Sequence, residues 1–156
     1  MLFFVIRLGF SYSLLAGTFT AAIMVLPLIM RSTEEALLSV DDSLREASFA
    51  LGAGKLRTIF RVVLPVAMPG ILSGVILAIG RVVGETAALM FTLGTATQLP
   101  DDLLSSGRTL ALHMYMLSTE GLHVNESYAT GVVLLVIILL INGLSTFLSN
   151  KLTKGR

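Results

Sequence analysis

The sequence contains no cysteine and no tryptophan, only two histidines, and few charged residues. The absence of cysteine excludes a disulfide, a thiolate metal site and a cysteine nucleophile. His113 and His123 lack a matching set of partner ligands, so we expect neither a metal site nor a cofactor. Charged residues make up 13% of the chain, against about 25% in soluble domains. Because 54% of the residues are hydrophobic, the composition predicts a membrane protein.

Two further absences limit the function. The formal net charge is only +1 and the basic residues are spread along the chain, so we expect no nucleic-acid binding. The sequence has no Gly-x-Ser-x-Gly or His-Glu-x-x-His pattern, and the Gly-Ala-Gly-Lys segment at residues 52–55 lacks the spacing of a Walker A loop. An intramembrane enzyme is therefore disfavoured, and the chain is not expected to hydrolyse ATP.

Three apolar stretches are long enough to cross a bilayer, which takes about 20 residues of helix. They cover residues 8–30, 69–97 and 127–150. The first is rich in small residues, which let membrane helices approach closely, so we expect it to pack inside a bundle. The pattern predicts an all-α integral membrane protein with three transmembrane helices and membrane lipid around them.

Lysine and arginine predict the orientation of these spans, because they are enriched on the cytoplasmic side. Eight of the 11 basic residues lie in the loop 31–68 and the tail 151–156. We therefore place this loop and the tail in the cytoplasm, and the loop 98–126 and the N-terminus outside.

The second span carries two ionisable residues, Arg81 and Glu85. A charge at the bilayer centre costs at least about 2.5–3.5 kcal/mol, and such residues face a polar pathway or each other. Residues at i and i+4 share one face of a helix, so Arg81 and Glu85 are expected to point the same way. One interpretation is a path for a polar solute; the other is an ion pair that locks the bundle together.

The cytoplasmic loop 31–68 is too long for a simple connection, and its pattern predicts two short helices. Ser43 and Glu46 have the spacing of a capping box at a helix start. Gly52 has the position of the glycine that follows a helix end. A second amphipathic segment is expected to end at Pro65, and Pro69 suits the first turn of the next helix.

The same loop carries a spaced motif. Glu46 and Ala47 are followed by Gly52, and then, after nine residues, by Val62, Val63, Leu64 and Pro65. This resembles the EAA signature of ABC-importer permeases, with Ser48 and Val62 as mild departures from it. The resemblance implies the MetI-like ABC importer permease fold. It also implies that the loop is a coupling helix that docks in the ATP-binding subunit through Glu46, Ala47, Gly52, Leu64 and Pro65.

The flanking sequence narrows the resemblance. The block Gly80–Ala87, which reads Gly-Arg-Val-Val-Gly-Glu-Thr-Ala, is similar to a segment of the permeases of the bacterial phosphate importer, and more to the A subunit than to its C partner. The resemblance implies a substrate path that includes Arg81, Glu85 and Thr86. A guanidinium suits phosphate because it forms charge-assisted, often bidentate bonds. The implied partners are an ATP-binding cassette subunit, a second permease subunit and a periplasmic or lipoprotein phosphate-binding protein.

Two other functions stay open. Permeases of this family have more spans than the three expected here, and residues 1–8 look like the end of an earlier helix, so the chain is interpreted as a C-terminal portion. It could be a truncated membrane remnant that binds the ATPase at most and transports nothing. It could also serve a different oxyanion.

Overall fold

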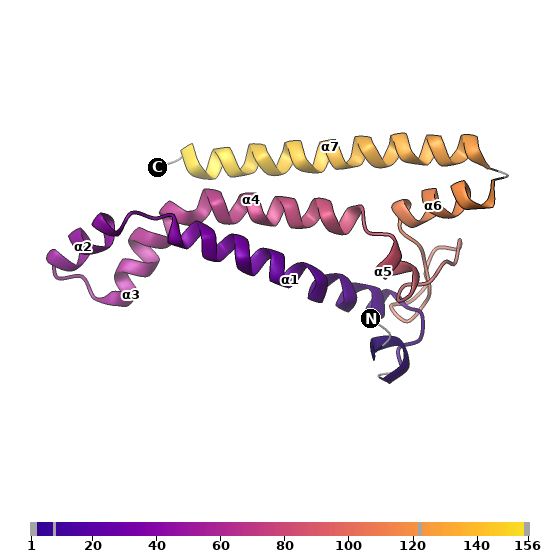
Figure 1. Ribbon diagram of the computed structural model, residues 1–156, viewed down its shortest axis with the longest axis horizontal. Coiled ribbons are helices and arrows are strands. Elements are labelled where there is room, and N and C mark those ends of the chain that lie inside the picture. The colour runs from indigo at the N-terminus through magenta and orange to yellow at the C-terminus, as the bar shows by residue number, and fades with distance from the viewer. Residues whose placement is uncertain (1–2, 8, 122, 155–156) are drawn as a thin grey trace. The chain divides into compact units, whose positions relative to one another are not determined.

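The computed structural model describes residues 3–7, 9–121 and 123–154, and every regular element within these ranges is a helix. The expected all-α fold is therefore confirmed. The chain divides into two compact units, one with Ile79–Asn142 and the residues up to Leu26, the other with Pro27–Ala78 and the residues from Gly143. Figure 1 shows the elements in chain order: η1 Phe3–Arg7, α1 Leu14–Leu38, α2 Asp42–Ala50, α3 Lys55–Thr58, η2 Ile59–Val63, α4 Leu64–Val83, α5 Ala87–Met90, α6 Leu110–Glu120 and α7 Val124–Lys154.

Three helical segments in the described part of the chain are long and apolar enough to cross a membrane. They are Leu14–Leu38, the continuous run Lys55–Val83, and Val124–Phe147, with 25, 29 and 24 residues. The first begins and ends later in the chain than the expected span 8–30. The second includes the end of the expected cytoplasmic loop. Which residues of each helix lie in the bilayer stays a prediction.

The helix expected over residues 69–97 ends at Val83 instead. The N–H groups of Gly84 and Glu85 still bond to the carbonyls of Gly80 and Val82, each at 3.2 Å. The chain then leaves the helical conformation and starts again as α5. Gly80 and Gly84 weaken the helix here, since glycine is about 1 kcal/mol less favourable than alanine in a helix interior.

The unit from Pro27 has a small core where α1 meets the start of α4. Its buried residues come from the end of α1 and the segment after it, and from η2 and α4: Ala36, Val40, Val63 and Ala67, with Leu37 and Ile71 packed against them.

Small residues bring α1 and α4 into direct backbone proximity. A Cβ atom added to Gly70 would lie 2.7 Å from the Cβ of Ala36, and one added to Gly74 would overlap the side chain of Ser32. Both pairs have four-residue spacing, so one face of each helix carries small residues that face each other. This is the small-xxx-small packing expected of membrane helices.

Pro65 does not end a helix, contrary to expectation. It lies in the first turn of α4, directly after the π-helical stretch Ile59–Val63, and the helix continues through it. In an α-helix the proline ring would meet the carbonyl of residue i−4, which is Arg61 and lies within the wider π turn. A local π turn is a known way of accommodating such a residue. Pro69 is likewise inside α4.

In the other unit, the long loop after α5 provides partners for the start of α1. The N–H groups of Leu14 and Leu15 donate to the carbonyls of Ser105 and Leu103, at 3.1 and 3.0 Å. The Ser13 hydroxyl, fully buried, accepts from the N–H of Ala16 at 3.2 Å. These bonds satisfy donors that every helix leaves free at its N-terminus. This loop leads into α6, which ends at Glu120.

Candidate functional site

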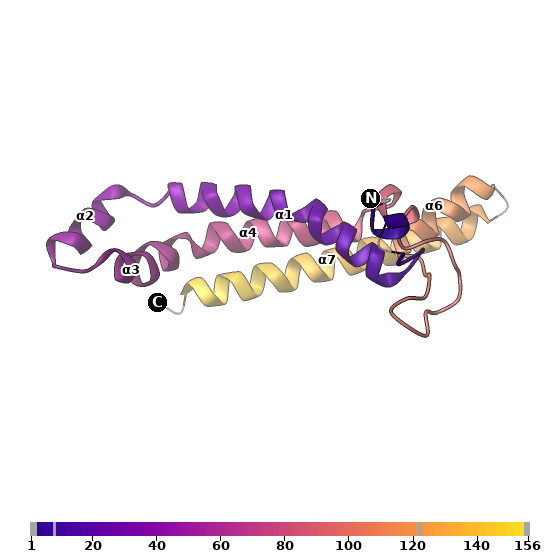
Figure 2. The same cartoon turned by 90° about the horizontal axis from the view of Figure 1, so that it is seen from below.

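The residues of the predicted docking loop lie on a hairpin of α2 and α3. This hairpin projects beyond the adjoining ends of α1 and α4, as Figures 1 and 2 show. Helix α2 has no buried residue. The hairpin is thus held mainly by hydrogen bonds at its ends rather than by a core of its own.

The N-terminus of α2 is capped by Asp41, whose carboxylate accepts from the backbone N–H of Ser43 at 2.8 Å. The expected capping box of Ser43 and Glu46 is therefore wrong by two residues. Asp41 is among the strongest N-cap residues and also complements the helix dipole. Its bonds with the Ser43 side chain and backbone lower the pKa of the Asp41 carboxyl below its ordinary value.

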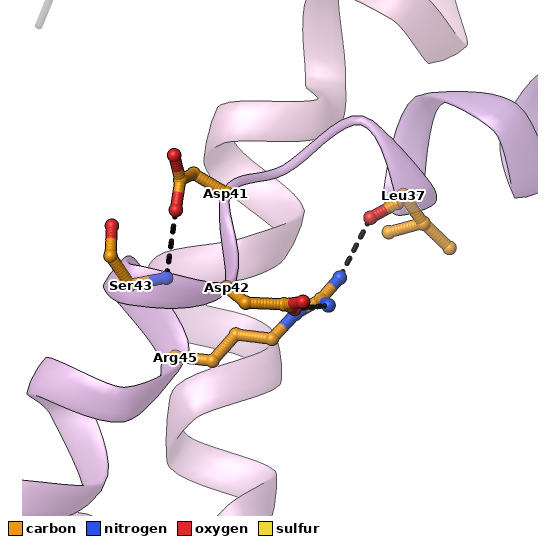
Figure 3. A network of polar contacts seen from close by, with 5 residues as sticks. All are labelled: Leu37, Asp41, Asp42, Ser43 and Arg45. Atoms are coloured by element: carbon orange, nitrogen blue, oxygen red, sulfur yellow. Dashed lines mark hydrogen bonds and ion pairs between the residues drawn. The ribbon is translucent and has the colours of Figure 1, made fainter.

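Arg45 connects α2 to the end of α1. One guanidinium nitrogen, Nη1, lies 2.5 Å from Oδ1 of Asp42. The other, Nη2, donates to the backbone carbonyl of Leu37 at 2.8 Å. Figure 3 shows both contacts, one within α2 and the other reaching the end of α1. The Leu37 carbonyl lies in the last turn of α1, where helix carbonyls lack intrahelical partners and attract a cation.

A second link connects α2 to α3. The Ser48 hydroxyl lies 2.9 Å from the hydroxyl of Thr58, which is 2% exposed. Thr58 in turn donates to the Gly54 carbonyl at 3.3 Å. Either hydroxyl can be the donor in the bond between Ser48 and Thr58. Ser48 stands where the EAA signature has its second alanine, so this link depends on the departure from the signature.

Gly52 ends α2 through its backbone. Its φ is +79°, a conformation that glycine adopts without strain. Its N–H donates to the backbone carbonyl of Phe49 at 2.9 Å, and the N–H of Ala53 donates to the backbone carbonyl of Ser48 at 3.1 Å. These two bonds form the Schellman arrangement. A Cβ at Gly52 would meet no other atom of the described chain within 4 Å, so no internal close approach requires this glycine.

The five predicted docking residues fall into two groups. Glu46, Ala47 and Gly52 are exposed on the hairpin, and Glu46 has no side-chain hydrogen bond or ion pair within the described ranges. Leu64 and Pro65 are half-buried at the start of α4. Sequence reasoning missed the exposed apolar side chains of the hairpin, although their positions close to the glycine turn could have indicated them. They are Leu44, Phe49, Leu51 and Leu56.

The predicted substrate-path residues lie at the end of α4. Arg81 is exposed in the last turn of α4 and forms no hydrogen bond or ion pair with any described residue. Glu85 lies beyond the helix end, and its Oε1 accepts from the backbone N–H of Ala88 at 3.1 Å. The expected common helix face of Arg81 and Glu85 is therefore wrong, because the helix ends at Val83 between them.

Thr86 has different neighbours from Arg81. It lines a pocket of about 540 Å³ whose other walls come from α6 and the start of α7. The wall is mainly apolar, and the polar side chains that line it carry hydroxyl groups. The hydroxyl of one of them, Ser127, donates to the Met114 carbonyl at 2.9 Å. Neither Arg81 nor Glu85 lines this pocket. Sequence reasoning missed its aromatic side chains, Tyr115 and Tyr128.

Comparison with known proteins gives a consistent result. The profile of the family described as "Binding-protein-dependent transport system inner membrane component" matches residues 1–154. The probable ABC transporter permease protein YqgI of Bacillus subtilis is 36% identical, over 98% of this chain and 59% of that protein. The phosphate transport system permease protein PstA of Mycobacterium leprae is 40% identical, over 90% of this chain and 46% of that protein. The phosphate transport system permease protein PstC of Xylella fastidiosa is 34% identical, over 81% of this chain and 38% of that protein.

The chain thus spans about half the length of the curated relatives it matches. No solved structure matches it significantly. The family and the three long apolar helices agree on a multi-pass protein of the inner membrane. The family is one of membrane transport components and not of enzymes.

Proposed function

Because the chain belongs to the family of binding-protein-dependent transport system inner membrane components, we propose that it is a permease subunit of an ATP-driven ABC importer for inorganic phosphate. It forms part of the translocation path, and it docks the ATP-binding subunit through the α2–α3 hairpin. Its further partners are a second permease subunit and an extracytoplasmic phosphate-binding protein. The proposal draws on the similarity to proteins named as phosphate transport permeases.

The observation that carries the docking proposal is the exposed hairpin. Glu46 and Ala47 lie on its surface and have no partner side chain within the described residues, and apolar Phe49 and Leu51 are exposed beside them. Single apolar or charged side chains are normal on a protein surface. Several exposed apolar side chains beside an unpaired carboxylate are instead typical of a surface that binds another protein. The predicted cytoplasmic side is also where an ATPase is found.

The phosphate path is proposed to include Arg81. Its guanidinium is free of protein partners among the described residues and can present two parallel donors to a phosphate. Glu85 and Thr86 follow it in the chain, but Glu85 already accepts a backbone bond. We therefore assign the direct phosphate contact to Arg81, and assign to Glu85 the task of holding the segment after α4 in place.

Uptake of radiolabelled phosphate tests the function. The chain is reconstituted in proteoliposomes with the other importer components encoded in its own genome, and ATP is supplied on the ATPase side. Uptake should be ATP-dependent, and unlabelled phosphate should compete while sulfate and molybdate should not. Competition by another oxyanion alone would indicate a different substrate. ATPase binding without any uptake would indicate the non-transporting remnant.

A further variant tests the role of Arg81. Arg81→Lys keeps the charge but loses the planar fork, so uptake should fall about tenfold or more, as expected when a charge-assisted bond is lost. Arg61→Lys is the matched control, because Arg61 is exposed and has no partner among the described residues. Equal uptake by the two variants, at equal amounts of membrane protein, would remove Arg81 from the path.

A further inference from the structure

The hairpin is fixed to the rest of its unit at two points. At one point Arg45 reaches from α2 to the carbonyl of Leu37 in the last turn of α1, at 2.8 Å. At the other point the hydroxyls of Ser48 and Thr58, in α2 and α3, are hydrogen-bonded at 2.9 Å, and α3 continues through η2 into α4 without interruption. Each link therefore ends on the cytoplasmic end of a different candidate membrane helix.

These two links differ from ordinary surface bonds. The side chain of Arg45 is 31% exposed, so its bond to the Leu37 carbonyl is partly shielded from water, whereas Asp42 is 79% exposed. Thr58 is buried, and its hydroxyl also lies 3.3 Å from the Gly54 carbonyl. Helix α2 has no buried residue, and it lies against α3 and η2, so the two polar links add to a packing that has no apolar core of its own.

We propose that Arg45 and Ser48 are positioning residues that connect the hairpin mechanically to α1 and α4. A movement of the docked ATPase is then passed from α2 to both helices at once, whereas an α2 joined only through the turns at its two ends would rotate without moving them. This inference rests on the docking role proposed above. It assigns the transmission of movement to residues outside the predicted docking set.

The orientation of the hairpin can be measured on the full chain alone. The protein has no cysteine, so Glu34→Cys in α1 and Ala50→Cys in α2, both at exposed positions, take two spin labels without interference. We expect a narrow distance distribution, and a distribution at least about twice as wide in Arg45→Gln or Ser48→Ala. Arg57→Gln is the matched control, because the exposed side chain of Arg57 forms no hydrogen bond or ion pair with any described residue. Unchanged widths in both test variants would overturn the proposal.

Transmission is measured in the reconstituted importer as phosphate transported per ATP hydrolysed. Arg45→Gln should bind the ATPase normally and lower this ratio about fivefold, the effect expected for one lost hydrogen bond. Arg45→Lys, which can reach only one of the two acceptors, should give an intermediate ratio. An unchanged ratio with a widened distance distribution would overturn the transmission role alone. Failure of the unaltered chain to bind the ATPase would instead overturn the docking proposal.

Discussion

Gly52 illustrates how one backbone angle ends an exposed helix. Its φ of +79° allows the two Schellman bonds that close α2, while its surroundings within the chain are open. Two explanations for a glycine at this position can therefore be separated. One is the backbone conformation, and the other is close contact with a docked ATPase.

Substitutions at Gly52 separate these explanations. Asparagine tolerates the left-handed conformation better than alanine, whereas alanine is smaller. If the backbone decides, Gly52→Ala should destabilise the turn by about 1 kcal/mol and weaken ATPase binding more than Gly52→Asn does. Binding is measured by co-purification at defined ATPase concentrations. If Gly52→Asn instead binds the ATPase more weakly than Gly52→Ala does, the position requires space for the ATPase rather than a special backbone conformation.

We propose separate roles for Arg81 and Glu85, and a charge exchange tests this proposal. Glu85 bonds to the Ala88 backbone, and arginine has no acceptor with which to replace that carboxylate. We therefore expect the double variant Arg81→Glu with Glu85→Arg to show no phosphate uptake. Glu85→Gln retains an acceptor oxygen and should keep most of the membrane protein level. Full uptake by the exchanged pair would establish the ion pair that locks the bundle.

At the scale of elements, the packing of α1 on α4 depends on the absence of side chains. Gly74→Ala would place a methyl group onto Ser32, and overpacking of this kind costs about 1–3 kcal/mol. We expect a lower midpoint of thermal aggregation in detergent. Gly80→Ala, where no atom lies within 4 Å, is the control and should be neutral or slightly stabilising.

A second substitution makes this prediction specific. Ser32→Gly removes the side chain that the new methyl group would overlap, so it should restore much of the stability lost in Gly74→Ala. Failure of this rescue would indicate that Gly74 is needed for a reason other than contact with Ser32.

The start of α2 should respond to acid. Hydrogen bonds with the Ser43 side chain and backbone favour the ionised carboxylate of Asp41 and lower its pKa. A carboxyl with a lowered pKa stabilises the fold above its unfolded pKa, and this contribution is lost as the pH falls through the folded pKa. Protection of the Ser43 amide from hydrogen exchange should therefore fall at acid pH. Asp41→Asn keeps the cap without titrating, so its protection should not change with pH over this range.

At the scale of the whole molecule, the topology rests on the distribution of basic residues and stays a prediction. The absence of native cysteine makes single-cysteine labelling direct. Ser43→Cys should react with an impermeant thiol reagent only after the membrane is opened, and Asp101→Cys should react in intact cells. Both native side chains are exposed. Labelling of Ser43→Cys in intact cells would place the hairpin outside and contradict ATPase docking.

Several features of the protein follow from the sequence by itself. The scarcity of charge and the three apolar runs determined an all-α membrane protein, because only helices or closed barrels satisfy backbone groups in lipid. The spaced motif around Glu46 and Gly52 indicated the family, since its residues are close in sequence and their spacing can be read without knowing any tertiary contact. The same local reasoning placed a glycine after α2.

Only the tertiary structure decided how long each helix is and what each polar residue binds. A π turn carries the helix through Pro65, and α4 ends at Val83, between two residues whose spacing suggested a shared face. Arg45 bonds to Leu37 eight residues away, and Ser48 bonds to Thr58 ten residues away. Such bonds depend on where the chain returns in space, which helical periodicity and residue type do not specify.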